Sequence, residues 1–357
     1  MTLRRVWVLS DGVAGHSNQA FGIVNLLFGD DAKVEKVYTS LRIPAVSRPL
    51  LRFLYNRIGP RLWVRSLTRR LYSGTLPATR SPSEIVISAG GNTRFLNAAS
   101  GGANIFIGSL RRLNGNLFRV LLTMEPAGCT TNVIMTLPPS RLSPELAEQA
   151  GARYRKHLNE SGNALNSKPW TLLVGGDGAG FSYSESDWYN LASLIRKLAQ
   201  QHGIRWLITT SRRTPAVGQQ YLKKTLDDQV VAEASWNGEP QKGTLIDYVG
   251  ASERVFCTAD SMSMLGDALN AGKPTCALMP LNANPNQRYK EALENFRDRF
   301  ALQCWPMAQE DTSNLELPAP ADLRASIQND RDDLKKRILA ALSENGAPTQ
   351  SNSDNLQ

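Results

Sequence analysis

The chain has 357 residues, which is longer than a usual single domain, so two domains with separate hydrophobic cores are expected. No stretch approaches the roughly 18 to 20 uninterrupted apolar residues of a membrane span, and the apolar run Val6–Leu9 is too short for a secretory signal. The four cysteines lie far apart without CxxC spacing, which argues against a disulfide framework and a zinc site. We therefore expect a cytoplasmic protein.

The first half of the chain alternates short apolar runs with helical or loop stretches, as expected for parallel strands joined by helices. Strands are predicted at Val6–Ser10, Val34–Thr39, Glu84–Ala89, Ala103–Ile107 and Phe118–Met124, with Val133–Leu137 as a further candidate.

The net charge of +9 is concentrated in the first half, where nine arginines and no acidic residue lie between Val37 and Ser83. Four of these arginines recur every fourth residue, which predicts one helix with its charges stacked on one face, Pro60 in its first turn and Trp63 on a neighbouring face. They are Arg57, Arg61, Arg65 and Arg69. The pattern favours an anionic membrane surface as a partner. A helix packed on the protein's own core is the alternative; a nucleic-acid surface is a third, and no nucleic-acid motif accompanies the charge.

A polar stretch from about Arg153 to Ser167 predicts a linker, placed at residues 156–168, after an N-terminal domain of residues 1–155. The alternation then restarts in a C-terminal domain of residues 169–320. Its strands are predicted at Trp170–Val174, Arg205–Thr210, Val230–Ala234, Val255–Thr258 and Thr275–Leu278, and its helices at Ser186–His202, Thr214–Leu226, Ser261–Ala271 and Asn286–Arg299. A helix at 321–344 is expected to return to the first domain, and 345–357 to form a disordered tail.

Strands alternating with helices predict an α/β fold of two Rossmann-like, doubly wound domains, expected to face each other across a cleft. Ligands of such sheets bind at the carboxyl ends of the strands. The residues that follow each strand are therefore the candidate site residues.

One such turn joins the strand ending at Thr258 to a predicted helix. Free backbone N–H groups at the helix start, Ser261–Met264, would favour a phosphate or diphosphate, and Asp267 could accept hydrogen bonds from a ribose. The candidate donor-binding residues of this turn are Asp260, Ser261, Met262 and Ser263. The competing interpretation is an ordinary helix cap, with Gly272-Lys273-Pro274 as a helix stop. After another strand, Arg212 and Arg213 could neutralise a leaving diphosphate, or could simply begin an exposed helix.

Glycine-rich turns follow three further strands and would let the backbone approach a ligand, although tight strand-to-helix turns use glycine in any case. On the first domain they supply Gly15, Gln19, Gly90, Gly91 and Asn92, and on the second Gly175, Gly176, Asp177 and Gly178.

His16 is a candidate general base for an acceptor hydroxyl, or a helix-start residue bonded to the backbone, and Asp11 is a rival base. No metal-binding cluster is found, and Asp330-Arg331-Asp332 is interpreted as a solvated helix face.

Together these stretches resemble the mitochondrial-fission Elm family, which is similar to GT-B glycosyltransferases. The matching stretches are Gly15-His16-Ser17-Asn18-Gln19 with Gly22, Gly175-Gly176, Ser211-Arg212-Arg213-Thr214-Pro215, and Thr258–Leu265 with Gly272-Lys273-Pro274. The chain departs from the family in having Asp267 where Glu is usual, and Ile246-Asp247-Tyr248 where Asn-Pro-Tyr is usual.

The resemblance implies a GT-B fold with the acceptor in the first domain, a nucleotide-sugar donor in the second, and no cofactor or obligatory metal. Donor contacts would fall to Arg212, Arg213, Ser261, Ser263 and Asp267, and a base to His16. The favoured function is a sugar transferase at the inner face of the bacterial inner membrane, acting on a lipid-linked or envelope glycan. The alternative is a non-catalytic peripheral-membrane scaffold that keeps the fold.

Overall fold

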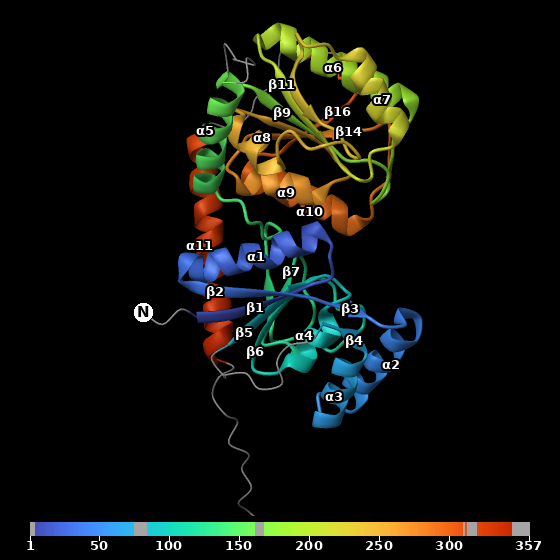
Figure 1. Cartoon of the computed structure of the whole chain (residues 1–357), viewed down its shortest axis with the longest axis vertical. Coiled ribbons are helices and arrows are strands. Elements are labelled where there is room, and N and C mark those ends of the chain that lie inside the picture. The colour runs from blue at the N-terminus through green and yellow to red at the C-terminus, as the bar shows by residue number, and fades with distance from the viewer. Residues whose placement is uncertain (1–3, 75–83, 161–167, 310, 313–319, 345–357) are drawn as a thin grey trace, which may run out of the picture. The chain divides into compact units, whose positions relative to one another are not determined.

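In the computed structural model, residues 4–74, 84–160, 168–309, 311–312 and 320–344 are described. The chain divides into two compact units (Figure 1): Met1–Arg141 with Asp330–Gln357, and Leu142–Asn329. Each unit is built on a six-stranded parallel sheet with helices around it, so the predicted α/β fold with two Rossmann-like sheets is confirmed.

The first unit's sheet has the strand order β2-β1-β5-β6-β7-β8, and every pairing is parallel. In chain order its strands are β1 (Arg4–Ser10), β2 (Ala32–Tyr38), β5 (Ile85–Ala89), β6 (Ala103–Ile107), β7 (Val120–Thr123) and β8 (Asn132–Ile134). Its α-helices are α1 (Ala14–Phe28), α2 (Pro44–Arg57), α3 (Leu62–Arg70) and α4 (Arg94–Ser100), with short 3-10 turns at Gly29–Asp31 and Gly115–Leu117. A two-stranded pair, β3 (Ser40–Leu41) with β4 (Tyr72–Ser73), frames α2 and α3. From β1 the chain continues to β2 at one edge of the sheet, and the later strands β5 to β8 are added on the other side of β1. The direction in which strands are added therefore reverses between β1 and β5.

The second unit repeats this plan with the order β12-β11-β9-β13-β14-β16. Its main strands are β9 (Trp170–Val174), β11 (Trp206–Thr210), β12 (Val231–Ser235), β13 (Val255–Thr258), β14 (Thr275–Met279) and β16 (Gln303–Pro306). Its helices are α5 (Pro144–Glu160), α6 (Glu185–His202), α7 (Ala216–Thr225), α8 (Leu245–Ala251), α9 (Met262–Asn270) and α10 (Gln287–Phe300), and β10 (Phe181–Ser182) pairs with β15 (Asn282–Ala283). Here the order reverses between β9 and β13.

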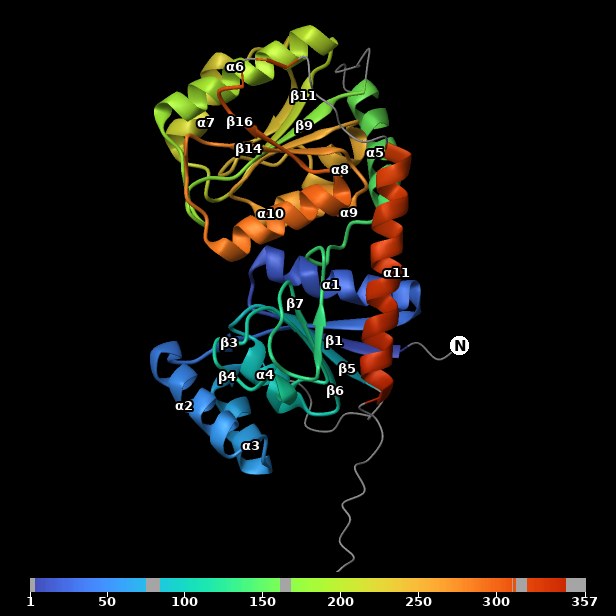
Figure 2. The ribbon, with the colours of Figure 1, turned by 180° about the vertical axis from the view of Figure 1, so that it is seen from behind.

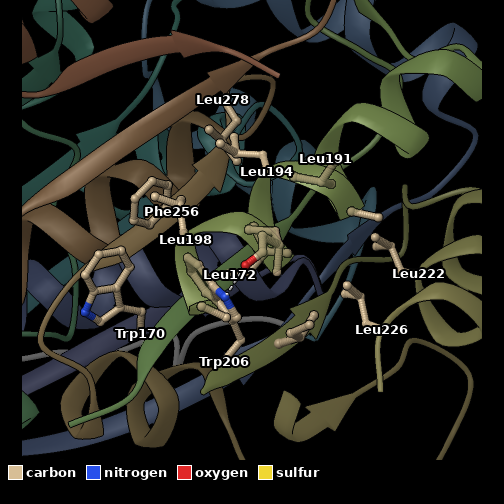
Figure 3. Packing of buried hydrophobic residues seen from close by; sticks show 14 of the residues in the cluster. Trp170, Leu172, Leu191, Leu194, Leu198, Trp206, Leu222, Leu226, Phe256 and Leu278 are labelled. Atoms are coloured by element: carbon tan, nitrogen blue, oxygen red, sulfur yellow. Dashed lines mark hydrogen bonds between the residues drawn. The ribbon is translucent and has the colours of Figure 1, made fainter. Parts of the chain in front are cut away.

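Aromatic side chains fill the core of the second unit (Figure 3). Trp170, Trp206 and Phe256 project from three strands with ring centroids 5.2–5.7 Å apart, and leucines of α6 and α7 cover them. The Trp206 indole N–H donates to the Ile195 carbonyl of α6 at 2.9 Å, so the buried polar atom of this ring is satisfied. This packing fixes the strands whose ends carry the candidate donor site.

The boundary between the units differs from the sequence prediction. The first unit ends at Arg141, and α5, which was divided between the first domain and a linker, belongs to the second unit. Gly151 of α5 lies so close to the backbone of α8 that a Cβ there would be 2.1 Å from the Gly250 carbonyl. The polar exposed face of this helix was therefore mistaken for a linker. Residues 161–167 and 345–357 lie outside the described residues.

The last helix, α11 (Pro320–Glu344), begins in the second unit and ends in the first. Leu334 and Ile338 are buried in the same core cluster as Val6 and Val8 of β1, beside which the helix runs in Figure 2. The Arg337 guanidinium donates to the Ile134 carbonyl of β8 at 2.6 Å. The second half of α11 thus completes the hydrophobic core of the first unit.

The basic segment is two helices, so the prediction of one helix with four stacked arginines is wrong. Arg57 ends α2 and Arg61 precedes α3, because the chain turns at Gly59, whose φ is +78°, and at Pro60. Only Arg65 and Arg69 lie on the same helix, one turn apart.

Candidate functional site

The two places where strand order reverses collect most of the predicted site residues. At such a switch point, loops leave neighbouring strands in opposite directions and open a crevice at the carboxyl edge of the sheet. In the first unit the loops after β1 and β5 meet there, and in the second unit the loops after β9 and β13.

At the first switch point His16 and Asp11 form a hydrogen-bonded dyad. The imidazole Nδ1 lies 3.1 and 3.0 Å from the two Asp11 carboxylate oxygens. An ionised carboxylate only accepts hydrogen bonds, so Nδ1 is the donor in this contact. The contact selects, for the neutral imidazole, the tautomer in which Nε2 carries the lone pair. The His16 side chain is 35% exposed, whereas that of Asp11 is 2% exposed.

Asp11 is held by donors from three parts of the chain. Besides His16, its carboxylate accepts hydrogen bonds from the Val13 N–H at 3.2 Å and from the Asn92 amide at 3.2 Å. A carboxylate has about four acceptor sites, and these donors occupy most of them. The contact with Asp11 orients the His16 ring, and the choice between the two residues as the base stays a prediction.

The glycine turn after β5 completes this site. Gly90 has a φ of +84°, and a Cβ there would lie 2.2 Å from the His16 Nδ1 atom, so only glycine leaves room for the ring. Gly91 and Asn92 follow it, and Asn92 also accepts a hydrogen bond from Arg48 at 2.7 Å. Gly15 and Gln19 lie on α1 beside His16; Gly15 faces open space and Gln19 is half-buried.

At the second switch point Asp260 is the centre of the predicted donor site. Its side chain is fully buried and accepts from the Gly176 N–H at 3.1 Å, the Tyr183 hydroxyl at 2.7 Å and the Arg213 guanidinium at 2.6 Å. Arg213 also donates to the Gly176 and Asp177 carbonyls at 3.4 and 3.5 Å. These bonds tie the ends of β9, β11 and β13 together.

Glycine is required where these loops touch. A Cβ on Gly175 would lie 2.2 Å from an Asp260 carboxylate oxygen, and one on Gly176 would lie 1.9 Å from the Arg213 carbonyl oxygen. Gly178, with a φ of +147°, passes under the Arg213 guanidinium. The Gly175 N–H donates to the Thr258 hydroxyl at 2.6 Å.

Two tyrosines that the sequence did not single out line this site. Burial, followed by the Asp260 carboxylate, raises the pKa of Tyr183 and of Tyr289 well above the ordinary value of 10. Both hydroxyls therefore stay protonated and donate, Tyr183 to Asp260 and Tyr289 to the Ala259 carbonyl at 2.6 Å. No motif marks these tyrosines in the sequence. Each comes from a segment distant in the sequence from the Ala259-Asp260 turn that it contacts.

The start of α9 supplies the predicted anion-binding edge. Ser261 is buried at the N-cap with no side-chain capping bond, Met262 is half-buried, and Ser263 is exposed. The first N–H groups of a helix have no partner within it. Asp267 lies on the same helix, half-buried, within electrostatic range of the Cys257 thiol.

The two predicted arginines differ in their state. Arg213 is engaged by Asp260, so its charge is largely neutralised within the site. Arg212 is exposed, and in the described part of the chain its guanidinium has no hydrogen bond or ion pair. Arg212 is thus the free cation at this edge.

The Gly272-Lys273-Pro274 segment lies at the opposite end of α9, about 14 Å from the helix start for nine residues. Lys273 is 6% exposed and its ammonium donates to the Gly250 and Ser252 carbonyls at 3.1 and 2.7 Å. The segment therefore ends α9, and its lysine caps α8. This agrees with the interpretation of Gly272-Lys273-Pro274 as a helix stop.

Among the described residues, no helix combines the length and the apolar character that a membrane span requires. No group of three or more histidine, cysteine, aspartate or glutamate side chains is arranged there to hold a metal ion.

Solved structures share this two-unit architecture. The apo structure of OtsA aligns over 95% of this chain and 99% of its own, with a TM-score of 0.50 and 12% identity. The UDP-GlcNAc 2-epimerase of Neisseria meningitidis, bound to UDP-GlcNAc, aligns over 95% and 100% with a TM-score of 0.51 and 11% identity. The fold is that of the GT-B class.

Within that class the chain is a member of the family described as mitochondrial fission ELM1, whose model matches residues 14–326. An uncharacterised protein of Rickettsia prowazekii (strain Madrid E) is 27% identical over 113 residues. That match spans about a third of each protein, 32% of this chain and 32% of the relative.

Proposed function

We propose that the protein is a glycosyltransferase that uses a nucleotide-diphosphate sugar as donor. The observation that carries the proposal is that each sheet has a polar constellation at its switch point, one suited to a diphosphate and one to proton abstraction. A GT-B fold alone would not specify either.

The second unit supports donor binding. The Arg212 guanidinium, which is unpaired among the described residues, and the N–H groups at the start of α9 provide positive potential for a diphosphate. The bonds of Asp260 to Arg213, Tyr183 and Gly176 hold the loops rigid, so these groups are oriented before the donor binds.

The first unit supports activation of the acceptor. His16 Nε2 would take the proton of an acceptor hydroxyl as its oxygen bonds to the sugar C1 atom and the C1–O bond to the diphosphate breaks. The nucleoside diphosphate leaves with the electron pair, and Asp11 stabilises the imidazolium that forms. This single displacement inverts the configuration at C1, which NMR of the product would test.

Donor binding is tested with Ser263→Asp. Ser263 is exposed in the first turn of α9, where an acidic residue stabilises a helix. We expect the variant to fold at least as stably as the wild type but to bind nucleotide sugars at least about tenfold more weakly, because its charge repels the diphosphate. The measurement is calorimetric titration with a panel of nucleotide sugars.

Ser263→Asn is the matched control, and Arg212→Ala should weaken the same titration because it removes an exposed, unpaired cation. If the wild type binds no nucleotide sugar, or if Ser263→Asp and Arg212→Ala bind as well as Ser263→Asn, donor binding at this edge is refuted. A scaffold without turnover would bind the donor and give no product.

We also propose that α2 rests on an anionic membrane surface, where a lipid-linked or envelope glycan acceptor would be found. Support comes from Val46, Leu50 and Phe53, which are 63%, 41% and 60% exposed and follow one another along one face of α2. Leu62 and Trp63 at the start of α3 are also exposed, at 84% and 50%. Arg57 and Arg61 lie between these two groups, at the turn that joins the helices, which suits anionic headgroups. Arg65 and Arg69 are half-buried on α3 and contribute less.

A further inference from the structure

Four arginines outside the proposed catalytic dyad converge beside it. Arg48 and Arg52 come from α2, Arg94 is the first residue of α4, and Arg111 lies in the loop after β6. Within the described residues none of the four has an ion pair with a carboxylate. The elements that carry them surround the turn Gly90–Asn92.

Hydrogen bonds show how one face of α2 brings these groups together. Arg48 donates to the Asn92 side chain at 2.7 Å, and Asn56 donates to the Arg112 carbonyl at 2.8 Å. Arg52 lies midway between Arg48 and Asn56, one helical turn from each. This face therefore spans the gap from the Asn92 turn to the loop of Arg111.

Arg94 lies at the base of that gap and is the unusual member. Arg94 is 5% exposed, and its guanidinium covers the Phe95 ring at 4.9 Å. Its Nε and Nη1 atoms are buried and have no hydrogen-bond partner in the part of the chain that the structure describes. A Cβ built on Gly91 would lie 3.6 Å from Nη1, so the guanidinium is next to the turn that holds His16.

The charges act on one another. Burial, then the positive charge of Arg111, lowers the pKa of Arg94, and Arg48 and Arg52 add to this effect while Tyr72 opposes it. The loop is also held in an unfavourable conformation, since Arg111 and Arg112 have φ values of +46° and +68°. A protein gains nothing in the unbound state from gathering like charges around unbonded buried donors.

We propose that this arginine cluster, Arg48, Arg52, Arg94 and Arg111, binds a phosphoryl group of the acceptor. Guanidinium groups match the geometry of phosphate oxygens and form bidentate, charge-assisted bonds with them. The cluster adjoins Asn92, which itself bonds to Asp11, so the bound phosphate would lie next to the dyad. That the phosphate belongs to an acceptor rests on the proposed glycosyltransferase function. The inference adds to that function that the acceptor is phosphorylated.

The test measures binding of phosphate monoesters to the full chain. Inorganic phosphate is titrated calorimetrically, and vesicles containing phosphatidic acid are compared with vesicles containing phosphatidylserine at matched charge. Arg94→Met keeps an apolar side chain over Phe95 but removes the buried donors, Arg52→Gln changes a residue nearer the surface, and Arg70→Gln, an exposed arginine of α3, is the matched control.

We expect Arg94→Met and Arg52→Gln to weaken binding at least about tenfold relative to Arg70→Gln. Loss of inorganic phosphate binding assigns the site to soluble phosphate esters, and loss confined to phosphatidic acid vesicles assigns it to a lipid-borne phosphate. The melting temperature of ligand-free Arg94→Met should equal or exceed that of the wild type, because an unpaired buried charge has been removed.

The inference is overturned if the wild type binds neither probe, or if both cluster variants bind like Arg70→Gln. It is also overturned if Arg94→Met is strongly destabilised while its response to phosphate is unchanged, since Arg94 would then be structural. Nucleotide-sugar titration of the same samples separates the two proposals. Absence of nucleotide-sugar binding would refute the proposed donor site but not phosphate binding by the arginine cluster. Absence of phosphate binding would refute the cluster but not the donor site.

Discussion

At the scale of single residues, the contact between His16 and Asp11 makes a prediction about catalysis. Asp11→Asn should lower kcat for sugar transfer about 10²–10⁴-fold, since an amide cannot hold the same imidazole tautomer or stabilise the imidazolium. Donor affinity, which belongs to the second unit, should not change. Steady-state kinetics together with donor titration measure both quantities.

The double variant decides whether the two residues act as one group. If Asp11 works only through His16, then His16→Ala combined with Asp11→Asn should be no slower than His16→Ala alone. Losses that multiply would assign Asp11 an independent role.

Most of the individual site residues could be found from the sequence, because each follows a strand that apolar residues make recognisable. His16, Gly90 and Asp260 are of this kind. What the sequence could not supply is the state of each side chain: Asp11 is buried and Arg213 is neutralised by a carboxylate 47 positions further on. Arg94 was missed because its meaning comes from burial and from the absence of a bonding partner within the described residues.

At the scale of elements, the C-terminus of α8 depends on the Lys273 ammonium group, which comes from the loop between α9 and β14. Burial lowers the pKa of Lys273 to about 8, with Glu148 opposing the shift, whereas the ordinary value is 10.5. Between these two pH values the unfolded chain binds a proton that the folded protein does not. The free energy of unfolding should therefore gain about 3 kcal/mol as the pH rises through that window.

Urea denaturation at several pH values, compared with Lys273→Met, measures this contribution. The variant should lack that part of the pH dependence, although it also loses the two bonds to the Gly250 and Ser252 carbonyls. Parallel curves for the two proteins would show that Lys273 does not titrate in this range.

The exposed row on α2 predicts membrane binding that depends on its apolar side chains. Replacing Val46, Leu50 and Phe53 with serine should reduce flotation with phosphatidylserine vesicles at least about tenfold, because their transfer into the membrane interface is lost. Tyr189→Ser with Val217→Ser, two exposed apolar positions of the second unit, is the control. Binding of the triple variant at the wild-type level would exclude this surface.

Helix limits were predictable only where apolar periodicity is strong. Regular spacing of arginines suggested one helix from Arg57 onward, but Gly59 and Pro60 interrupt it, and charge spacing carries no information about such a break. In α5 the polar face dominates the composition, and its buried face is formed largely by small residues, Ala147, Ala150 and Gly151, which give a weak apolar signal.

At the scale of the whole molecule, the two sheets with their reversed strand orders were predictable, because alternation of strands and helices restricts the topology. The return of the helix at 321–344 to the first domain was also expected, whereas the boundary was placed too late, inside α5 and not at Arg141. Leu334→Ala or Ile338→Ala should destabilise the first unit by about 2–5 kcal/mol through loss of core packing.

Hydrogen exchange resolved by peptide is the appropriate measurement. Protection of β1 and β5 should fall in these variants while that of β9 and β13 is retained. Equal losses in both sheets would mean that the two units unfold as one.

The discontinuity of the first unit also has a consequence for biosynthesis. After Arg141 leaves the ribosome, the whole of Leu142–Asn329 must be made before the helix that buries Leu334 and Ile338 is available. At about 5–20 residues per second this interval is on the order of 10 to 40 seconds. When it ends, the second unit has all of its described strands, whereas the apolar face that α11 covers in the first unit is still open to chaperones.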